Sequence, residues 1–452
     1  MTAKYQAYSE YKGSGVEWLG SIPAQWSITS LKMLVDVRDG THETPPYVEI
    51  SDNSYPLVTS KDVTSGILGF ELCKHISEDD YSSIIKRSKV DIGDILMPMI
   101  GTVGSPIIVN ERDNFAIKNL ALFKTYKNEN ISTSFLNYFL QSHECEIQFS
   151  LEARGGVQNF VSLGTLRDLG VPVISTEEQV NIANFLDHET AKIDTLIEKQ
   201  QQLIKLLKEK RQAVISHAVT KGLNPNAPMR DSGVEWLGEV PEHWEVIFIK
   251  HLSTVKRGAS PRPIDDKKYF DDNGEYAWVR IADVSKAGMY LTSTTQRLSN
   301  LGASLSVKLE PKQLFISIAG TVGKPCLTIS KACIHDGFVY FPDLSINNKF
   351  LFYIFEAGEA YLGLGKMGTQ LNLNTETVGG IKVGLPPANE IEELICFIEK
   401  SNDKYRNLIF KANESIQLMQ ERRTALISAA VTGKIDLRNW QAPNKEKREV
   451  SV

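Results

Sequence analysis

"SGVEWLG" occupies residues 14–20, and the same seven residues recur at 232–238. Two longer segments also repeat: "GDILMPMIGTVGSP" (93–106) matches "KQLFISIAGTVGKP" (312–325), and "KEKRQAVISHAVTKG" (208–222) matches "QERRTALISAAVTGK" (420–434). The chain therefore consists of two diverged copies of one unit. Because two copies are too few for a solenoid, we expect a pseudo-dimer with an approximate two-fold axis.

The composition is that of a globular protein with more than one domain. The 452 residues are 42% hydrophobic and 23% charged, enough for two or more well-cored domains. No apolar run reaches membrane-spanning length and the N-terminus lacks a hydrophobic signal segment, so we expect a cytoplasmic protein. The five cysteines form no C-x-x-C pair and have no histidine at zinc spacing, which predicts reduced thiols.

The charge gives little support for nucleic-acid binding. The net charge of −5 argues against it at first sight. Residues 27–170 carry 13 basic and 19 acidic side chains, whereas residues 245–386 carry 16 basic and 13 acidic ones. Only the second copy therefore shows a weak basic signal.

Each copy combines two periodicities. Short strand-like runs separated by Gly, Pro, Asn and Asp fill residues 22–174 and 240–387, which predicts a compact α+β head in each copy. Apolar residues then recur every three or four positions from Thr176 to about Val219 and from about Asn389 to Val431. These stripes predict two long helices that pair as an antiparallel coiled coil. The acidic residues of "EEQ" (177–179) are interpreted as helix-cap and surface residues.

We therefore predict an α+β fold with two heads separated by two long antiparallel coiled-coil helices in a pseudo-two-fold repeat. Because the repeat is cyclic, the two ends should lie near each other. Trp18 and Trp236 are expected to be packing anchors. The predicted segments are an N-terminal joint (1–26), head one (27–174), a central spacer helix (175–222), a linker (223–244), head two (245–387), a distal spacer helix (388–433) and a C-terminal tail (434–452).

The sequence contains no convincing catalytic motif. "GLGKMG" (363–368) fits G-x-G-x-x-G, but it follows a helix-like run and precedes "TQLNLN" rather than a helix. "TPPY" (44–47) resembles the tetrad of DNA amino-methyltransferases, but threonine is a poor acceptor for the target amino group. No Walker A loop is present, and both "GTVG" segments are expected to be hairpin turns. We predict no catalytic, cofactor-binding or metal-binding residue. A stand-alone DNA adenine methyltransferase and a coiled-coil protein adaptor remain as alternatives.

The first copy contains, in this order, the segments "VRDGTHETPPY", "GDILMPMIGTVG", "GGVQN", "VPV", "EEQ", "IANFLD" and "KEKRQAVI", and the second copy contains a degenerate version of this set. In this combination the chain resembles the specificity subunit of type I restriction-modification systems. The resemblance covers essentially the whole chain. It implies that each head is a target recognition domain that binds one half of a bipartite, asymmetric double-stranded DNA target, while the helices set the gap. It also implies a role in host defence with two modification subunits, which carry S-adenosylmethionine, and two restriction subunits, which carry ATP and Mg²⁺.

Base recognition requires Arg or Lys for guanine and Asn or Gln for adenine. The DNA-binding candidates in head one are Arg38, Thr41, His42, Lys61, Lys118, Asn119, Gln158 and Asn159. Those in head two are Lys256, Arg257, Ser260, Arg262, Arg280, Lys324, Gln370 and Asn372. The segment "KRGASPR" (256–262) is favoured because two arginines and a lysine surround a glycine turn.

Overall fold

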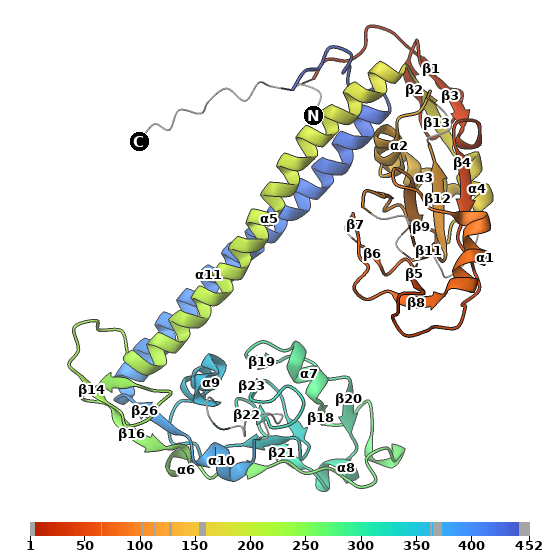
Figure 1. Cartoon of the computed structure of the whole chain (residues 1–452). Coiled ribbons are helices and arrows are strands. Elements are labelled where there is room, and N and C mark those ends of the chain that lie inside the picture. The colour runs from red at the N-terminus through yellow and green to blue at the C-terminus, as the bar shows by residue number, and fades with distance from the viewer. Residues whose placement is uncertain are drawn as a thin grey trace. The chain divides into compact units, whose positions relative to one another are not determined.

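The computed structural model describes residues 5–64, 66–101, 103–111, 114–125, 129–152, 160–361, 364 and 373–442. The chain divides into two compact units. Unit 1 comprises Met1–Gln200 with Glu414–Val452, and unit 2 comprises Gln201–Asn413. The two long helices that the periodicity predicts are present as α5 (Thr176–Lys221) and α11 (Ala388–Val431), and each contributes one half to each unit (Figure 1). No helix in these described ranges is long and apolar enough to cross a membrane.

The head of unit 1 is built on two small sheets. A four-stranded antiparallel sheet has the order β10-β9-β12-β4, and a second sheet has the order β11-β5-β8 with β11 parallel to β5. The elements are β1 (Tyr11–Gly13), β2 (Ser21–Pro23), β3 (Ser27–Ser30), β4 (Asp36–Asp39), β5 (Ser54–Val58), β6 (Val63–Thr64), β7 (Ile67–Leu68), β8 (Lys74–Ser77), α1 (Glu78–Ser88), β9 (Ile95–Pro98), β10 (Ile107–Ile108), β11 (Ala116–Ile117), β12 (Leu120–Lys124), α2 (Thr133–Leu140), α3 (His143–Glu152), α4 (Leu163–Asp168) and β13 (Gly170–Val173).

The head of unit 2 repeats this plan with additions. Its sheets have the orders β17-β25-β22-β23-β19 and β20-β18-β24-β21, and β18 is parallel to β24. The elements are β14 (Met229–Asp231), β15 (Glu239–Pro241), β16 (Glu245–Phe248), α6 (Ile249–Leu252), β17 (Lys256–Arg257), β18 (Tyr276–Val279), α7 (Ile281–Lys286), β19 (Tyr290–Leu291), β20 (Gln296–Leu298), α8 (Asn300–Ser304), β21 (Val307–Leu309), β22 (Leu314–Ser317), β23 (Pro325–Thr328), β24 (Ala332–Ile334), β25 (Phe338–Tyr340), α9 (Asn348–Ala357), α10 (Thr375–Gly379) and β26 (Lys382–Leu385).

The two heads share a common core. The order β10-β9-β12-β4 in unit 1 corresponds to β23-β22-β25-β17 in unit 2. Each "GTVG" segment joins an antiparallel pair, β9 to β10 and β22 to β23, so the hairpin prediction is confirmed. The predicted fold class is confirmed as well, because each copy contains an α+β head followed by a long helix. All five cysteines are free thiols, as predicted.

The repeated "SGVEWLG" segment forms a tight turn with the same hydrogen bond in both copies. The amide of its serine donates to the carbonyl oxygen of its last glycine, over 2.8 Å in the first copy and 2.9 Å in the second. Trp18 and Trp236 each pack against the hydrophobic core of their own unit while staying partly exposed. Their predicted role as packing anchors is confirmed.

A second tryptophan in each copy ties the head to the first turn of the following long helix. Trp26 and Trp244 are almost fully buried, and their indole N–H groups donate to Glu178 and Glu390, each over 3.1 Å. Glu178 also accepts a hydrogen bond from the hydroxyl of Tyr8. Glu178 is buried, so the interpretation of the "EEQ" carboxylates as surface residues is wrong for this residue. Two aromatic groups donate hydrogen bonds to the carboxylate and so compensate its burial.

Within unit 1 the two helix halves run in opposite directions. Asn181 near the start of α5 donates to the carbonyl oxygen of Arg438 over 2.9 Å, whereas Asp194 further along α5 pairs with Arg423 over 3.0 Å. Leu186 and Ile427 belong to the same buried cluster as the core of the head. The halves of α5 and α11 that belong to unit 1 are thus part of its hydrophobic core.

Segments near the two ends of the described chain meet in unit 1. The Tyr11 hydroxyl donates to the carbonyl oxygen of Gly433 over 2.9 Å, and the Asp436 amide donates to that of Gln6 over 2.8 Å. The expectation drawn from the cyclic repeat is confirmed for these residues.

Candidate DNA interface

In unit 1 the loop after β4 is clamped to the turn between β11 and β12. Gly40 donates its amide to Leu120 over 2.9 Å, Thr41 donates to Ile117 over 3.0 Å, and Asn119 donates back to Thr41 over 3.1 Å. A Cβ atom on Gly40 would lie 2.3 Å from the carbonyl oxygen of Ile117. The close approach of the two segments therefore requires glycine at this position.

This approach gathers polar side chains into a group that we call cluster 1: Asp39, His42, Arg87, Lys118 and Asn119. The Nδ1 atom of His42 lies 2.9 Å from Oδ1 of Asn119, and its Nε2 atom lies 3.0 Å from Oδ2 of Asp39. Arg87 on α1 donates to the other oxygen of Asp39. Lys118 donates to a threonine hydroxyl in the loop after β4. Cluster 1 thus presents an amide, an imidazole and two cations.

The histidine of cluster 1 is held by two acceptors. The hydrogen bond to Asn119 and then the one to Asp39 raise the pKa of His42, against the opposing effect of partial burial. Both ring nitrogens face oxygen atoms, so only the imidazolium donates to both. Protonation therefore tightens the link between the loop and the turn.

Unit 2 contains a similar clamp, with counterparts of two of the three backbone hydrogen bonds of unit 1. Gly258 donates its amide to Phe338 over 2.9 Å, and Ala259 donates to Ile334 over 3.1 Å. A Cβ atom on Gly258 would lie 2.1 Å from the carbonyl oxygen of His335. The loop after β17 and the turn between β24 and β25 thus correspond to the loop and turn of unit 1, although the turn in unit 2 is one residue longer.

The side chains at the corresponding place, which we call cluster 2, are Arg257, Ser260, Arg262, His335 and Asp336. The carboxylate of Asp336 accepts from the Ser260 hydroxyl over 3.1 Å and from Nη2 of Arg262 over 3.2 Å. Its carbonyl oxygen accepts from Nε of Arg257 over 2.5 Å. Burial alone would raise the pKa of Asp336, but the Ser260 hydroxyl and the Arg262 charge outweigh it and lower that pKa. Cluster 2 therefore presents two guanidinium groups held by one aspartate, Arg262 by its carboxylate and Arg257 by its carbonyl oxygen.

A cavity of about 460 Å³ lies beside cluster 2. His335 lines it with its ring centroid 5.9 Å from that of Trp278, and the Gly337 amide donates to Nδ1 over 2.9 Å. Burial lowers the pKa of His335, opposed by the charge of Asp336 and aided by that of Arg280. Because Nδ1 accepts from the Gly337 amide, the neutral ring carries its proton on Nε2. The lining residues are Ile264, Asp265, Lys267, Phe270, Trp278, Arg280, Gln296 and His335.

The structure brings together about half of the candidates. Thr41, His42, Lys118 and Asn119 meet at cluster 1, and Arg257, Ser260 and Arg262 meet at cluster 2.

The remaining candidates lie apart from the clusters or outside the described residues. Arg38 binds Asp36 through Nε and Nη2 and the carbonyl oxygen of Arg87 through Nη1. Lys61 is exposed after β5, Lys256 is exposed on β17, Arg280 lines the cavity, and Lys324 follows the "GTVG" turn. Gln158, Asn159, Gln370 and Asn372 lie outside the residues that the structure describes.

Sequence reasoning missed Asp39, Arg87, His335 and Asp336. A signal was available for two of them, because "AIKN" (116–119) aligns with "CIHD" (333–336) just before the central strand of each head. Asp39 and Arg87 are 48 positions apart in the chain and meet only in the folded structure.

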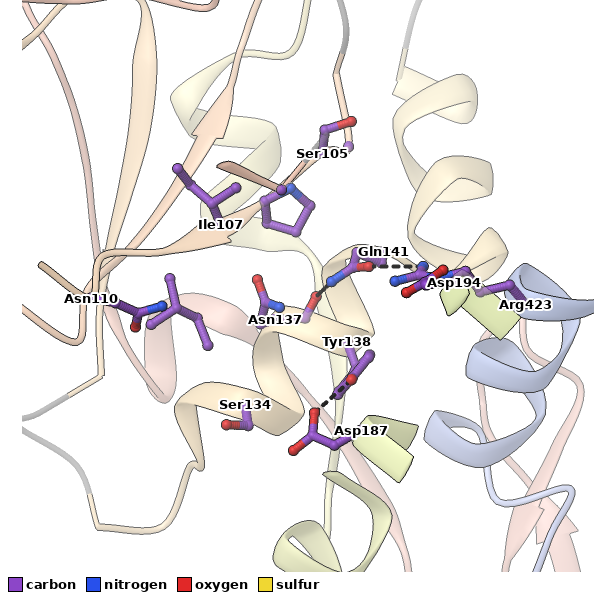
Figure 2. A pocket seen from close by; sticks show the side chains of 14 residues that line it. Ser105, Ile107, Asn110, Ser134, Asn137, Tyr138, Gln141, Asp187, Asp194 and Arg423 are labelled. Carbon is purple, nitrogen blue, oxygen red and sulfur yellow. Dashed lines mark hydrogen bonds and ion pairs between the residues drawn. The ribbon is translucent and has the colours of Figure 1, made fainter. Parts of the chain in front are cut away.

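A larger cleft, of about 600 Å³, lies in unit 1 between α2, the β10 hairpin and the two long helices (Figure 2). Its polar groups are largely paired with one another. The Tyr138 hydroxyl donates to Asp187 over 2.6 Å, and Arg423 donates to Asp194 over 3.0 Å and to Gln141 over 3.3 Å.

Unit 2 has the matching contacts at its own junction of head and helices. Arg211 on α5 donates to Asn402 on α11 over 2.9 Å and reaches Glu356 on α9 over 3.5 Å. Because these contacts are alike in both units and join head to helix, we interpret both places as structural junctions.

Comparison with known proteins decides the family. The model of the type I restriction modification DNA specificity domain matches residues 23–206 and again 241–417. The chain belongs to the type I specificity subunit family. DNA target recognition is therefore its function, and the resemblance drawn from the sequence is confirmed.

Similar specificity subunits match along nearly their whole length. The putative type I restriction enzyme MjaX specificity subunit of Methanocaldococcus jannaschii is 24% identical over 449 residues, covering 96% of this chain and 99% of the relative. The StySPI specificity subunit of Salmonella potsdam is 20% identical, with 94% of this chain and 92% of the relative covered.

Solved structures support the same fold. A chain from a type I R-M system structure concerned with complex assembly and conformational transition has a TM-score of 0.68 at 15% identity, covering 92% of this specificity subunit and 99% of that chain. The HsdS subunit of Thermoanaerobacter tengcongensis has a TM-score of 0.50 at 16% identity, with 92% and 98% covered.

Proposed function

We propose that cluster 1 and cluster 2 are the base-contacting surfaces of this specificity subunit, and that each binds one half of a bipartite, asymmetric DNA target. One observation carries the proposal. Two backbone hydrogen bonds of the clamp, one from the glycine and one from the residue after it, are the same in both units, whereas the side chains displayed there differ. A shared scaffold with different donors and acceptors is what two different half-sites require.

The chemistry of the two clusters suits bases in a groove. Asn119 offers an amide, the group that pairs with the adenine edge in two hydrogen bonds, and the arginines of cluster 2 offer the fork that suits guanine. Lysines at the margin, such as Lys256, add phosphate contacts that set position and are sensitive to salt. Because head one carries more acidic than basic side chains, partner subunits supply much of the contact with the DNA phosphates.

We place this chain as a non-catalytic member of a larger cytoplasmic complex. The proposal comprises two modification subunits that carry S-adenosylmethionine and two restriction subunits that carry ATP and Mg²⁺. The assembly named for the structural relative supports such a partnership in general. Neither a stand-alone methyltransferase nor an adaptor finds support in the comparisons.

The test is a head exchange. The subunit is co-expressed with a modification subunit, and methylated adenines are mapped across the host genome. Replacing residues 27–174 by the head of another specificity subunit should change one half of a gapped motif and leave the other half intact. Replacing residues 245–387 should change only the other half. If one exchange changes both halves, the assignment of one half-site to each head is wrong.

A point substitution tests the cluster itself. Asn119→Ala should relax base preference at one position of the half-site bound by head one. Asn413→Ala serves as the matched control, because this exposed asparagine bonds only within its own helix among the residues described. An unchanged motif with Asn119→Ala would remove cluster 1 from the proposal.

A further inference from the structure

In cluster 2 a single aspartate, Asp336, accepts hydrogen bonds from three side chains of the facing segment. Arg257 at the end of β17 and Arg262 in the following loop both bond to Asp336 of the facing turn, Arg257 to its backbone carbonyl oxygen and Arg262 to its carboxylate. Ser260 in the same loop bonds to the same carboxylate. The turn residue thus organises the side chains of the loop.

The pairing leaves the arginine forks available. Arg257 is held through Nε, and among the described residues no hydrogen bond or ion pair occupies its Nη1 and Nη2 atoms. Arg262 is held through Nη2 alone and has 75% of its side chain exposed. Guanine is recognised by two parallel N–H donors that reach its O6 and N7 atoms. A guanidinium anchored at one nitrogen presents such a pair with less rotational freedom than a free side chain.

The ion pair adds little to the stability of the fold. The Asp336 carboxylate is 43% exposed and Arg262 more so, and exposed pairs of this kind contribute little because water and salt screen them. The Asp336 side chain therefore matters mainly for the geometry of Arg262, while the backbone carbonyl oxygen of Asp336 holds Arg257.

The same position in unit 1 has different chemistry. Asn119 stands where Asp336 stands, and it is bonded by His42 where Asp336 is bonded by Ser260. The arginine of β4, Arg38, has all three of its nitrogen donors bound within the protein. The loop after β4 in head one contains no arginine, and the exposed arginine of cluster 1, Arg87, comes from α1 and is held by Asp39 of β4.

We propose that Asp336 is a positioning residue whose carboxylate orients Arg262 toward guanine, so that the half-site bound by head two contains at least one guanine. Asp336 acts through Arg262 and does not itself contact the base. This inference rests on the proposed role of cluster 2 in base contact.

The test uses the full chain in complex with a modification subunit, with methylation mapping as the measurement. Asp336→Asn keeps the size of the side chain and removes its charge. We expect preference for one guanine in half-site two to fall about tenfold, the scale of a bidentate base contact, while half-site one stays unchanged. Arg262→Lys keeps the charge but removes the fork, and should relax the same guanine position.

The matched control is Asp403→Asn on α11. It removes another exposed Asp–Arg pair, Asp403 with Arg406 at 3.3 Å, in the same unit but away from cluster 2. It should leave the motif unchanged. Melting temperatures of the complexes show that the variants are folded, and Arg262→Lys keeps the test decisive if Asp336→Asn fails to fold.

The outcomes separate the inference from the proposed function. If Arg262→Lys relaxes a guanine and folded Asp336→Asn does not, cluster 2 contacts bases but Asp336 does not position Arg262. If half-site two contains no guanine, the inference is also overturned. If substituting both arginines with alanine leaves the motif intact, cluster 2 is not a base-contacting surface at all.

Discussion

The clamp at Gly40 allows a quantitative prediction that links backbone packing to DNA recognition. In Gly40→Ala the added methyl group would lie 2.3 Å from the carbonyl oxygen of Ile117 and 2.6 Å from its carbonyl carbon. Both atoms belong to the backbone of β11, so no side-chain rotation relieves the contact. The loop must move away by roughly 1 Å to reach ordinary van der Waals separation.

This movement breaks the hydrogen bonds of the clamp. Three backbone bonds join the loop and the turn: Gly40 to Leu120, Thr41 to Ile117, and Asn119 to Thr41. At roughly 0.5–1.5 kcal/mol each, their loss costs about 2–4 kcal/mol of the stability of head one. The link between His42 and Asn119 is lost at the same time, so cluster 1 loses its geometry.

Two assays check this reasoning. Urea denaturation of Gly40→Ala should show the loss in stability, and methylation mapping with a modification subunit should show weakened preference in one half-site only. Gly13→Ala is the control, since its added Cβ would meet nothing within 4 Å. The reasoning is refuted if Gly40→Ala matches Gly13→Ala in both assays.

Two further predictions concern buried and titrating groups. The pKa of His42 should exceed 6.5, its ordinary value, because the charged ring bonds to Asn119 and Asp39. The stabilisation of the link between loop and turn by the charged ring is then complete below pH about 6.5 and is lost as the pH rises through the raised pKa. An NMR titration of His42, compared with the same titration in Asp39→Asn, measures this pKa. A His42 pKa at its ordinary value would contradict the prediction. Glu178→Gln should destabilise unit 1 by about 2 kcal/mol, because it removes a charged acceptor of two buried aromatic donors. Glu390→Gln should reduce the stability of unit 2 by a smaller amount, since that carboxylate is 22% exposed. Hydrogen exchange measured in each unit checks this, and an equal loss of stability in the two units would contradict it.

Much of the candidate site was accessible from the sequence, but its organisation was not. Arg257 and Arg262 were favoured because they surround a glycine turn, and both meet at cluster 2. Arg38 looked equivalent in sequence, yet its guanidinium is bound to Asp36 and to a carbonyl oxygen. Local composition does not distinguish an arginine held by its neighbours from one that faces outward.

The sequence by itself determined the duplication, the α+β heads, the two long helices and the hairpins at "GTVG". These features depend on periodicity, on turn residues and on the comparison of one copy with the other, all of which are local or internal to the chain. Tertiary structure alone decided that Asn119 and Asp336 occupy matching places and that Glu178 is buried under Trp26. Those relations arise where segments far apart in the chain approach closely, through Gly40 and Gly258 in the heads and at the first turn of each long helix. Such contacts depend on how the segments pack, which no periodicity along the chain specifies.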